Sequence, residues 1–354
     1  MPRGTALVVR FSSLGDVLLA AHLPAFLRDA DPERRVLFAT KERYAAVLRG
    51  HPDVARFYLL ADGSLDPAAP APIAVTGSLG ILGGYLRREG IEEAFDLHQN
   101  LRSSRLIGSL GRVRRIDPPK HGLSRRLLVF ARWVRPKPVP PLLETYRGIA
   151  GLDPGAPVRP WLREALTDAE RARARARLAD GAEGFAFLGV GARWATKRWP
   201  MERFVALGEL LARDLSLVPR YAVAPGEPDG ATLRKLLPPE RHAEIVETGF
   251  REAAAIASFA RVIVSNDSAA LHLGPALGVP TVGIFGSTVP AFGFAPRGPR
   301  DAVVETEIAC RPCGVHGKRR CPLGHHRCMT EIAPPAVLEA VRRVTAGAEP
   351  GRGG

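Results

Sequence analysis

The sequence feature that most constrains the fold is a repeated alternation of short apolar runs with stretches of helical spacing. The strand-like runs cover residues 6–11, 36–40, 57–60, 95–97, 185–190, 221–224, 244–246, 262–265 and 281–285. Between them, stretches such as 17–30 and 42–49 repeat apolar residues with the period of a helix, and 334–344 predicts a closing helix. Strands that alternate with helices are typical of βαβ units, so both halves of the chain are predicted to be α/β with parallel sheets.

The chain is long enough for more than one domain. Its 354 residues correspond to about two domains of roughly 150 residues each. Seven prolines between residues 135 and 160 interrupt any continuous core element and indicate a linker or crossover. We predict two doubly wound domains facing a central cleft, over residues 1–157 and 158–346, and a disordered tail over 347–354.

Composition and charge narrow the class of protein. Hydrophobic residues make up 46% of the chain and charged residues 24%, which is ordinary for a globular protein and excludes a disordered or collagen-like chain. No apolar run reaches the roughly 18 to 20 residues that span a bilayer, and the N-terminus lacks the pattern of a signal peptide, which predicts a cytoplasmic protein. The net charge is +14, and residues 102–147 hold twelve Lys or Arg, which predicts an anionic partner.

The first polar motif is Ser12-Ser13-Leu14-Gly15-Asp16, directly after the first predicted strand. Gly15 permits a sharp turn, and Ser12, Ser13 and Asp16 stand at the carboxyl end of a parallel strand, where ligands bind. Asp16 could equally act only as a helix cap, and both interpretations stay open at this point. No Gly-x-Gly-x-x-Gly occurs here, which argues against a nicotinamide-dependent oxidoreductase.

The second motif, GVGARWATKRWP, follows a predicted strand of the second half and runs from Gly189 to Pro200. Thr196 and Lys197 precede a helix there and would meet a phosphate, with Lys197 as a compact charge. The motif is not a Walker A sequence, because the Gly-Lys-Ser/Thr order is absent. The alternative is a solvated basic loop.

The third motif, SNDSAALH over residues 265–272, lies at another strand-to-helix junction. Ser268 and Ala269 would offer backbone N–H groups to an anion at the start of a helix, and His272 lies one helical turn further on. The alternative is capping by Asp267 and a histidine in the core. Because strand-end motifs occur in both halves, they fit a phosphate-containing ligand held between two domains.

Four cysteines, Cys310, Cys313, Cys321 and Cys328, lie within nineteen residues. Disulfides are disfavoured in the cytoplasm, and four clustered thiols suit tetrahedral zinc. The spacing differs from a standard zinc ribbon, and nearby histidines add candidate ligands. A structural zinc in this Cys-rich segment, residues 310–328, and a set of reduced thiols are both left open.

Residues 123–134 predict an amphipathic helix, with Leu123, Leu127, Phe130 and Val134 on one face and arginines beside it. Such a face could rest on an anionic membrane surface. We favour the simpler interpretation, in which the apolar face belongs to the core and the arginines to its rim.

The three motifs, in this order and spacing, resemble the ADP-heptose:lipopolysaccharide heptosyltransferases of glycosyltransferase family 9 across nearly the whole chain. The similar segments are RFSSLGDVLLAAHLPAFLR, ARWATKRWP and SNDSAALHLGPALGVPTVGIFGST. The resemblance implies a GT-B fold with two Rossmann-like domains, the first binding mainly the acceptor and the second mainly the nucleotide sugar. It also implies that catalysis requires no cofactor and that the Cys-rich segment takes no part in it.

The resemblance also implies roles for individual residues. By position, Asp16 is similar to the general base of the family and Lys197 to its pyrophosphate-binding lysine, both catalytic. Glu227 resembles the acidic residue that holds the nucleoside, and Ala269 stands where the family commonly has glycine. The positions that resemble substrate-binding ones are Ser12, Ser13, Gly15, Thr196, Glu227, Asp267, Ser268, Ala269 and His272, the last four being the nucleotide-binding motif.

The resemblance and the charge together imply an inverting glycosyltransferase. It would move a heptose from ADP-heptose to a phosphorylated, lipid A-linked lipopolysaccharide core acceptor, in peripheral contact with the cytoplasmic face of the inner membrane. The alternative is a basic nucleic-acid-binding protein with a four-cysteine zinc module. Aromatic residues make up only 6% of the chain and no recognition module is apparent, so we expect no nucleic-acid partner.

Overall fold

The computed structural model describes residues 4–62, 74–130, 138–155, 158–178, 184–296 and 298–346. Contacts divide the chain into a first unit, Met1–Lys120 with Leu142–Thr167, and a second unit, His121–Pro141 with Asp168–Gly354. The chain therefore passes from one unit to the other more than once, whereas we placed a single boundary between residues 157 and 158. The predicted tail over 347–354 lies outside the described residues.

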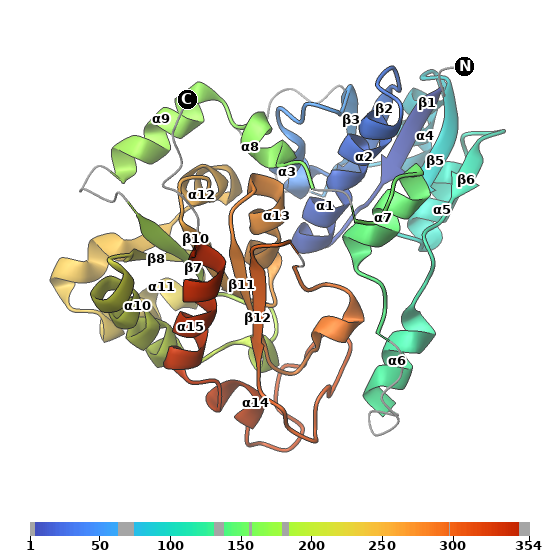
Figure 1. Ribbon diagram of the computed structural model, residues 1–354. Coiled ribbons are helices and arrows are strands. Elements are labelled where there is room, and N and C mark those ends of the chain that lie inside the picture. Colours follow the sequence, from blue (N-terminus) through green and yellow to red (C-terminus); the bar gives the residue numbers. More distant parts are fainter. Residues whose placement is uncertain are drawn as a thin grey trace. The chain divides into compact units, whose positions relative to one another are not determined.

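The first unit is built on a six-stranded parallel sheet in the order β4-β3-β2-β1-β5-β6 (Figure 1). Its strands are β1 (Thr5–Val9), β2 (Val36–Lys41), β3 (Arg56–Leu60), β4 (Ala74–Thr76), β5 (Ile91–Asp96) and β6 (Arg114–Ile116). Its helices are α1 (Leu14–Ala20), α2 (His22–Ala30), the 3₁₀ helix η1 (Glu42–Tyr44), α3 (Ala45–Leu48), α4 (Leu79–Arg87), α5 (Leu101–Gly108), α7 (Leu142–Ala150) and α8 (Trp161–Ala165). The strand order reverses between β1 and β5, which makes their carboxyl ends the topological switch point where doubly wound sheets bind ligands.

The second unit has its own six-stranded parallel sheet, in the order β12-β11-β10-β7-β8-β9. Its strands are β7 (Phe185–Gly189), β8 (Val218–Val223), β9 (Ile245–Glu247), β10 (Val262–Asn266), β11 (Thr281–Phe285) and β12 (Asp301–Glu305). Its α-helices are α6 (Gly122–Phe130), α9 (Asp168–Arg177), α10 (Met201–Leu215), α11 (Pro228–Leu236), α12 (Phe250–Ala257), α13 (Leu273–Leu277), α14 (Arg327–Thr330) and α15 (Pro334–Thr345). Short 3₁₀ helices are η3 (Ala195–Lys197), η4 (Pro239–Glu244), η5 (Ala269–His272) and η6 (Pro290–Phe292). The switch point of this sheet lies between β7 and β10.

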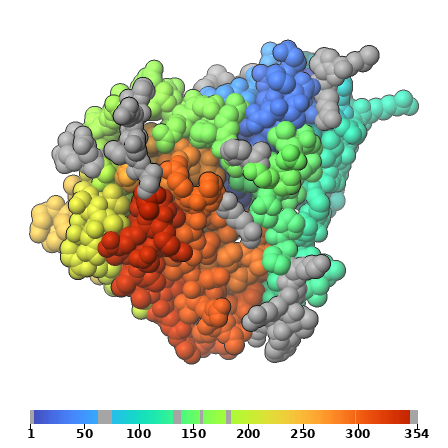
Figure 2. Space-filling view, in the orientation of Figure 1, coloured from blue at the N-terminus to red at the C-terminus, as the bar shows by residue number. Residues whose placement is uncertain are grey.

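Both sheets are buried on their two faces, as parallel sheets require. Along β1, Leu7 and Val9 join a core cluster with residues of α4 and α5, while Ala6 and Val8 are buried on the opposite face. In the second unit, α15 buries its inner side in the core, and its outer side forms part of the surface, coloured red in Figure 2. This burial explains why the interior strands are continuous apolar runs in the sequence.

The predicted elements differ from the structure mainly at the sheet edges. No prediction covered the edge strands β4, β6 and β12; β6 has the polar sequence RRI, and β12 is short and only partly buried. The single helix predicted over 17–30 is two helices, α1 and α2, which meet at Ala21.

The prediction that the apolar face of the 123–134 helix belongs to the core is wrong for the described residues. In α6, Leu123 is 72% exposed and Phe130 75% exposed, and Leu127 is exposed as well; Val134 lies outside the described residues. The helix packs through Leu128 and through Arg125, which donates to the carbonyl of Phe292 at 3.0 Å. Among the described residues, no helix is long and apolar enough to cross a membrane.

His51 is a buried titratable group of the first unit. Its Nε2 donates to the carbonyl oxygen of Ala21 at 2.7 Å, and its Nδ1 accepts the N–H of Asp53 at 3.1 Å. The ring stacks on Trp161 with centroids 4.4 Å apart. Burial lowers the pKa of His51 to about 4, because the charged imidazole would lose its hydration.

We expect His51 to destabilise the fold in acid. The imidazole takes up a proton near pH 6.5 in the unfolded chain but only near pH 4 in the folded one. The contribution of His51 to the free energy of unfolding is therefore complete above pH 6.5 and is lost as the pH falls toward 4. The loss in the free energy of unfolding should be about 3 kcal/mol. Urea titrations of the wild type and of His51→Leu between pH 7 and pH 4 check this. Parallel pH profiles for the two proteins would show that another group is responsible.

Candidate functional site

Asp16 lies in the first turn of α1, directly beyond the carboxyl end of β1. The backbone N–H and the hydroxyl of Ser13 donate to its Oδ2 at 2.9 and 2.8 Å, and Arg10 Nη2 lies 2.8 Å from the same oxygen. Ser13 is the N-cap of α1 and Asp16 its third residue, so these contacts belong to a capping box, which fits the alternative that Asp16 is a first-turn residue. Within the described residues every partner of Asp16 binds Oδ2, so Oδ1 has no hydrogen bond there.

The surroundings of Asp16 favour its charged form. Burial alone would raise the pKa of this carboxyl, but the charge of Arg10 and the donors on Ser13 outweigh it and hold the pKa below its usual value. The side chain is still 27% exposed. Asp16 is therefore both a cap and an ionised carboxylate with one oxygen available to a ligand. Ser12 and Gly15, two other predicted residues, are half-buried in the same turn.

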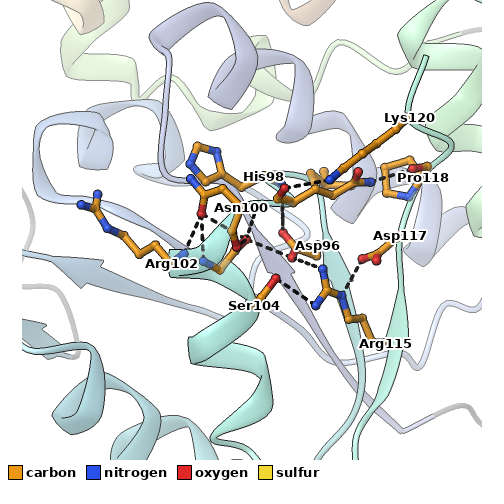
Figure 3. A network of polar contacts seen from close by, with 12 residues as sticks. Asp96, His98, Asn100, Arg102, Ser104, Arg115, Asp117, Pro118 and Lys120 are labelled. Carbon is orange, nitrogen blue, oxygen red and sulfur yellow. Dashed lines mark hydrogen bonds and ion pairs between the residues drawn. The ribbon is translucent and has the colours of Figure 1, made fainter. Parts of the chain in front are cut away.

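A network of polar contacts holds the loop after β5, the strand that pairs with β1 (Figure 3). The buried Asp96 accepts the backbone N–H groups of His98 and Gln99 through Oδ1, at 3.1 and 2.7 Å. Its Oδ2 accepts the hydroxyl of Ser103 at 2.9 Å and Nη2 of Arg115 at 2.7 Å. The loop at the switch point of the first sheet is thus tightly positioned.

This loop also contacts the residues around the first strand. Arg10 donates to the carbonyl of Leu97, and the rings of Phe11 and His98 meet edge to face with centroids 5.8 Å apart. Nδ1 of His98 is buried without a hydrogen-bond partner among the described residues, and burial and Arg10 lower the pKa of His98. Arg10 and His98 were not predicted as site residues. The polar run 96–100 directly after an apolar strand is the signal in the sequence that points to His98.

In the second unit, an ion pair joins the loops that follow β7 and β10. Lys197 Nζ lies 2.6 Å from Oδ2 of Asp267, and the hydroxyl of Thr288 donates to the same oxygen at 2.6 Å. The side chains of Lys197 and Asp267 are 14% and 10% exposed. The structure therefore brings the second and third motifs together at the switch point of the second sheet. Thr288, the last residue of the segment SNDSAALHLGPALGVPTVGIFGST, was not predicted as a site residue.

The turn after β10 passes very close to the end of β7. A Cβ atom on Gly189 would lie 2.7 Å from Cβ of Ala270 and 2.8 Å from Oγ of Ser265, so only glycine fits at this position. The glycine of the second motif thus serves close packing between the two strand ends.

The third motif begins as a 3₁₀ turn. Ser268 precedes η5, Ala269 starts it and the buried His272 ends it, and α13 then runs for only five residues. We predicted a helix starting at Ser268; instead, close packing on β7 draws the segment into a tighter turn. An anion here would depend on Lys197 more than on a helix N-terminus.

Two predicted residues have contrasting surroundings. Glu227 is exposed at the start of α11 and reaches solvent. Thr196 is buried, and its hydroxyl contacts the backbone of Lys318 and the hydroxyl of Ser287. A ligand can reach Glu227 directly, whereas Thr196 already has protein partners.

The four cysteines all lie in the described part of the chain and form no disulfide. Cys328 is buried and the others are half-buried. Sγ of Cys310 lies 3.9 Å from Nε2 of His325. No group of three or more His, Cys, Asp or Glu side chains among the described residues is placed to hold a metal ion. The arrangement of the thiols therefore gives no support to a zinc centre.

Solved structures of glycosyltransferases have this architecture. ADP-heptose lps heptosyltransferase II of E. coli matches with a TM-score of 0.68 and 18% identity, over 97% of this chain and 98% of that chain. The glycosyl transferase family 9 protein of Veillonella parvula DSM 2008 matches with a TM-score of 0.74 and 18% identity, over 98% of this chain and 99% of that chain. The fold is therefore the α/β GT-B fold of glycosyltransferases, as predicted.

The family is defined by sequence. Residues 81–323 match glycosyltransferase family 9 (heptosyltransferase), so the chain belongs to this family and the predicted resemblance is confirmed. Lipooligosaccharide heptosyltransferase 2 of Campylobacter jejuni (serotype O:6) is 30% identical over 88 residues, which are 25% of this chain and 27% of that protein. The aligned part of this chain thus covers about a quarter of the length of that curated relative.

Proposed function

We propose that this chain is an inverting glycosyltransferase that transfers a heptose from ADP-heptose to a hydroxyl of a lipid A-linked lipopolysaccharide core acceptor. The observation that carries the proposal is that each unit has its charged candidate residues at the switch point of its own sheet. These are Asp16 in the first unit and Lys197 with Asp267 in the second. Membership of glycosyltransferase family 9 supports sugar transfer and argues against the alternative of a nucleic-acid-binding protein.

In the proposed reaction, the acceptor oxygen attacks the anomeric carbon while its proton passes to Oδ1 of Asp16. The bond between that carbon and the β-phosphate oxygen breaks on the opposite face, and its electron pair leaves with ADP. Lys197 stabilises the charge that develops on the diphosphate, and Glu227 holds the nucleoside. The scheme uses no cofactor.

A nucleotide screen on the full chain tests the donor. A ligand that binds only the folded state, at about 100 times its Kd, stabilises that state by about 2.7 kcal/mol. ADP is therefore expected to raise the Tm, while UDP and GDP at the same concentration leave it nearly unchanged. Sugar transfer from ADP-heptose to a lipid A-core acceptor then tests the reaction. A preference for uridine nucleotides would contradict the ADP donor.

We assign the phosphorylated acceptor to the first unit. A pocket of about 390 Å³ lies there at the carboxyl ends of β2 and β3, and Lys41, Leu60, Leu79 and Arg102 are among its lining residues. Lys41 and Arg102 supply positive charge for a phosphate, and the leucines supply apolar surface.

We assign the peripheral membrane contact, at the cytoplasmic face of the inner membrane, to α6. Leu123, Leu127 and Phe130 form an exposed apolar face, and the exposed Arg126 stands beside them. An apolar face flanked by arginine matches the acyl boundary and the charge of an anionic bilayer.

Removing the apolar face of α6 should weaken membrane binding. Each side chain that enters the bilayer is worth about 1.5 to 3 kcal/mol, so Leu123→Ser with Phe130→Ser should lower binding to vesicles of anionic phospholipid at least tenfold. Co-sedimentation measures this, with Leu323→Ser as the matched control, because Leu323 is also exposed in the second unit. Equal binding by the two variants would contradict the assignment.

A structural zinc remains a proposal for the Cys-rich segment, without a role in the reaction. The present arrangement of the thiols does not favour it. Elemental analysis of the purified chain decides: about one zinc per chain indicates a bound metal, and none indicates reduced thiols.

A further inference from the structure

We propose that the Cys-rich segment positions Lys197 for the donor through Gly317 and Lys318, and thereby sets the affinity for the ADP moiety. The inference rests on the proposed function, in which Lys197 meets the diphosphate. It assigns a positioning role to a segment that the reaction scheme leaves without one.

The backbone of Lys318 is bonded to Thr196, the residue before Lys197. The N–H of Lys318 donates to Oγ1 of Thr196 at 2.8 Å, and the carbonyl of Lys318 accepts the N–H of Thr196 at 3.2 Å and its hydroxyl at 3.1 Å. Thr196 is almost fully buried. Buried hydrogen bonds of this kind are costly to break, because each unpaired group loses its hydration without compensation. Thr196 is therefore a positioning residue, which joins the segment to the loop of Lys197.

Gly317 packs directly against the side chain of Lys197. Its φ is +87°, and a Cβ atom there would lie 3.2 Å from Cγ of Lys197 and 2.9 Å from Cβ of Trp194. The stem of Lys197 is thus confined by Gly317, while its Nζ is paired with Asp267. A lysine held at both ends has already lost much of its rotamer freedom, which lowers the entropic cost of binding a ligand.

The same segment is also connected to Asp267, the other member of the ion pair, through Thr288. Arg311 donates to the carbonyl of Thr288 at 2.9 Å, and Thr288 donates in turn to Asp267. The N–H of Cys313 donates to the carbonyl of Ser287 at 3.1 Å. Contacts from the Cys-rich segment therefore reach the loop of Lys197 directly and Asp267 indirectly, through Thr288 in the loop after β11.

Substitution of Gly317 tests the proposal from the side of the segment. Gly317→Ala should raise the Kd for ADP roughly tenfold, because the new methyl group displaces Lys197. A tenfold change in Kd corresponds to about 1.4 kcal/mol of binding free energy. Gly324→Ala is the matched control: its φ is +73°, so it suffers similar backbone strain in the same segment, but its Cβ would meet nothing within 4 Å. It should change the Kd less than twofold. The KM for the acceptor should stay unchanged in both variants.

Substitution of Thr196 tests the proposal from the side of the loop that carries Lys197. Thr196→Val removes the hydroxyl and should raise the Kd for ADP by a similar factor, and Thr196→Ser should restore most of the affinity. Thr281→Val is the control, since it removes another buried hydroxyl of the second unit, whose bond is to the carbonyl of Val279. A loss of Tm without a change in Kd is expected for this control.

Hydrogen exchange of the ligand-free variants tests the contact between Gly317 and the loop of Lys197 independently of ADP binding. Faster exchange in residues 194–199 of Gly317→Ala, but not of Gly324→Ala, supports the contact itself. If the wild type binds no ADP, the proposed function fails and the positioning role falls with it. If the wild type binds ADP and the two glycine variants bind it equally well, only the positioning role is overturned.

Discussion

Replacing Asp16 with asparagine is expected to slow sugar transfer by roughly 10²- to 10⁴-fold, the usual effect of losing a general base. The side-chain oxygen of asparagine can still accept the hydrogen bonds from Ser13, but the amide cannot take the proton of the acceptor. The cost in the free energy of unfolding should be about 1 kcal/mol or less, because the pair with Arg10 is partly exposed and screened. Transfer rates at saturating donor, together with the Tm and the affinity for ADP, check this.

A control separates capping from catalysis. Ser78 caps α4 in the same unit, where its hydroxyl accepts the N–H of Ile81. Ser78→Ala should lower stability by about 1 kcal/mol and leave the transfer rate near that of the wild type. An Asp16→Asn protein that transfers sugar at the parental rate would show that Asp16 is only a cap and that another group is the base.

The pH profile gives a second readout for Asp16. Its pKa lies below the usual 3.8, so the carboxylate stays ionised between pH 5 and pH 7 and loses its function only as the pH falls through the lowered pKa. Transfer should therefore show no acid limb from Asp16 within that range. A limb near pH 6 that disappears in Asp16→Asn would contradict the environment described for this carboxyl.

Replacing Lys197 with alanine is expected to slow transfer by roughly 10²-fold and to weaken binding of ADP, since it removes a charge from the site of the departing diphosphate. Lys235→Ala is the control, because Lys235 is an exposed lysine in the last turn of α11 of the same unit. It removes the same charge away from the switch point and should leave both quantities unchanged. Calorimetric titration with ADP and steady-state rates measure the difference.

The ion pair offers a second explanation for slow transfer by Lys197→Ala. The substitution leaves the carboxylate of Asp267 without its partner, and this unpaired charge could itself disturb the site. The double variant Lys197→Ala with Asp267→Asn removes that leftover charge. If Lys197 meets the diphosphate, the double variant should remain as slow as the single one. Recovery of activity in the double variant would show that Lys197 serves only to neutralise Asp267.

The sequence alone was sufficient for much of the fold and for placing the candidate motifs at the ends of strands. Interior strands such as β7 and β10 are buried on both faces, so each appears as an apolar run, and the helices between them repeat with the helical period. Strand ends are local features as well, which is why the turn at Asp16 and the loop at Lys197 could both be placed at carboxyl ends. Edge strands such as β6 escaped prediction because their partial burial permits polar residues.

What the sequence by itself determined is therefore local: which segments are strands, which residues follow them, and the family to which the motifs point. The tertiary structure decided the order of the strands, and with it that Asp16 lies at one switch point and Lys197 at the other. It also decided the pairing of Lys197 with Asp267 and the position of Gly317 over the lysine stem. These contacts join segments about 70 and 120 residues apart, and they depend on how sheets and loops pack together rather than on any local preference of the chain.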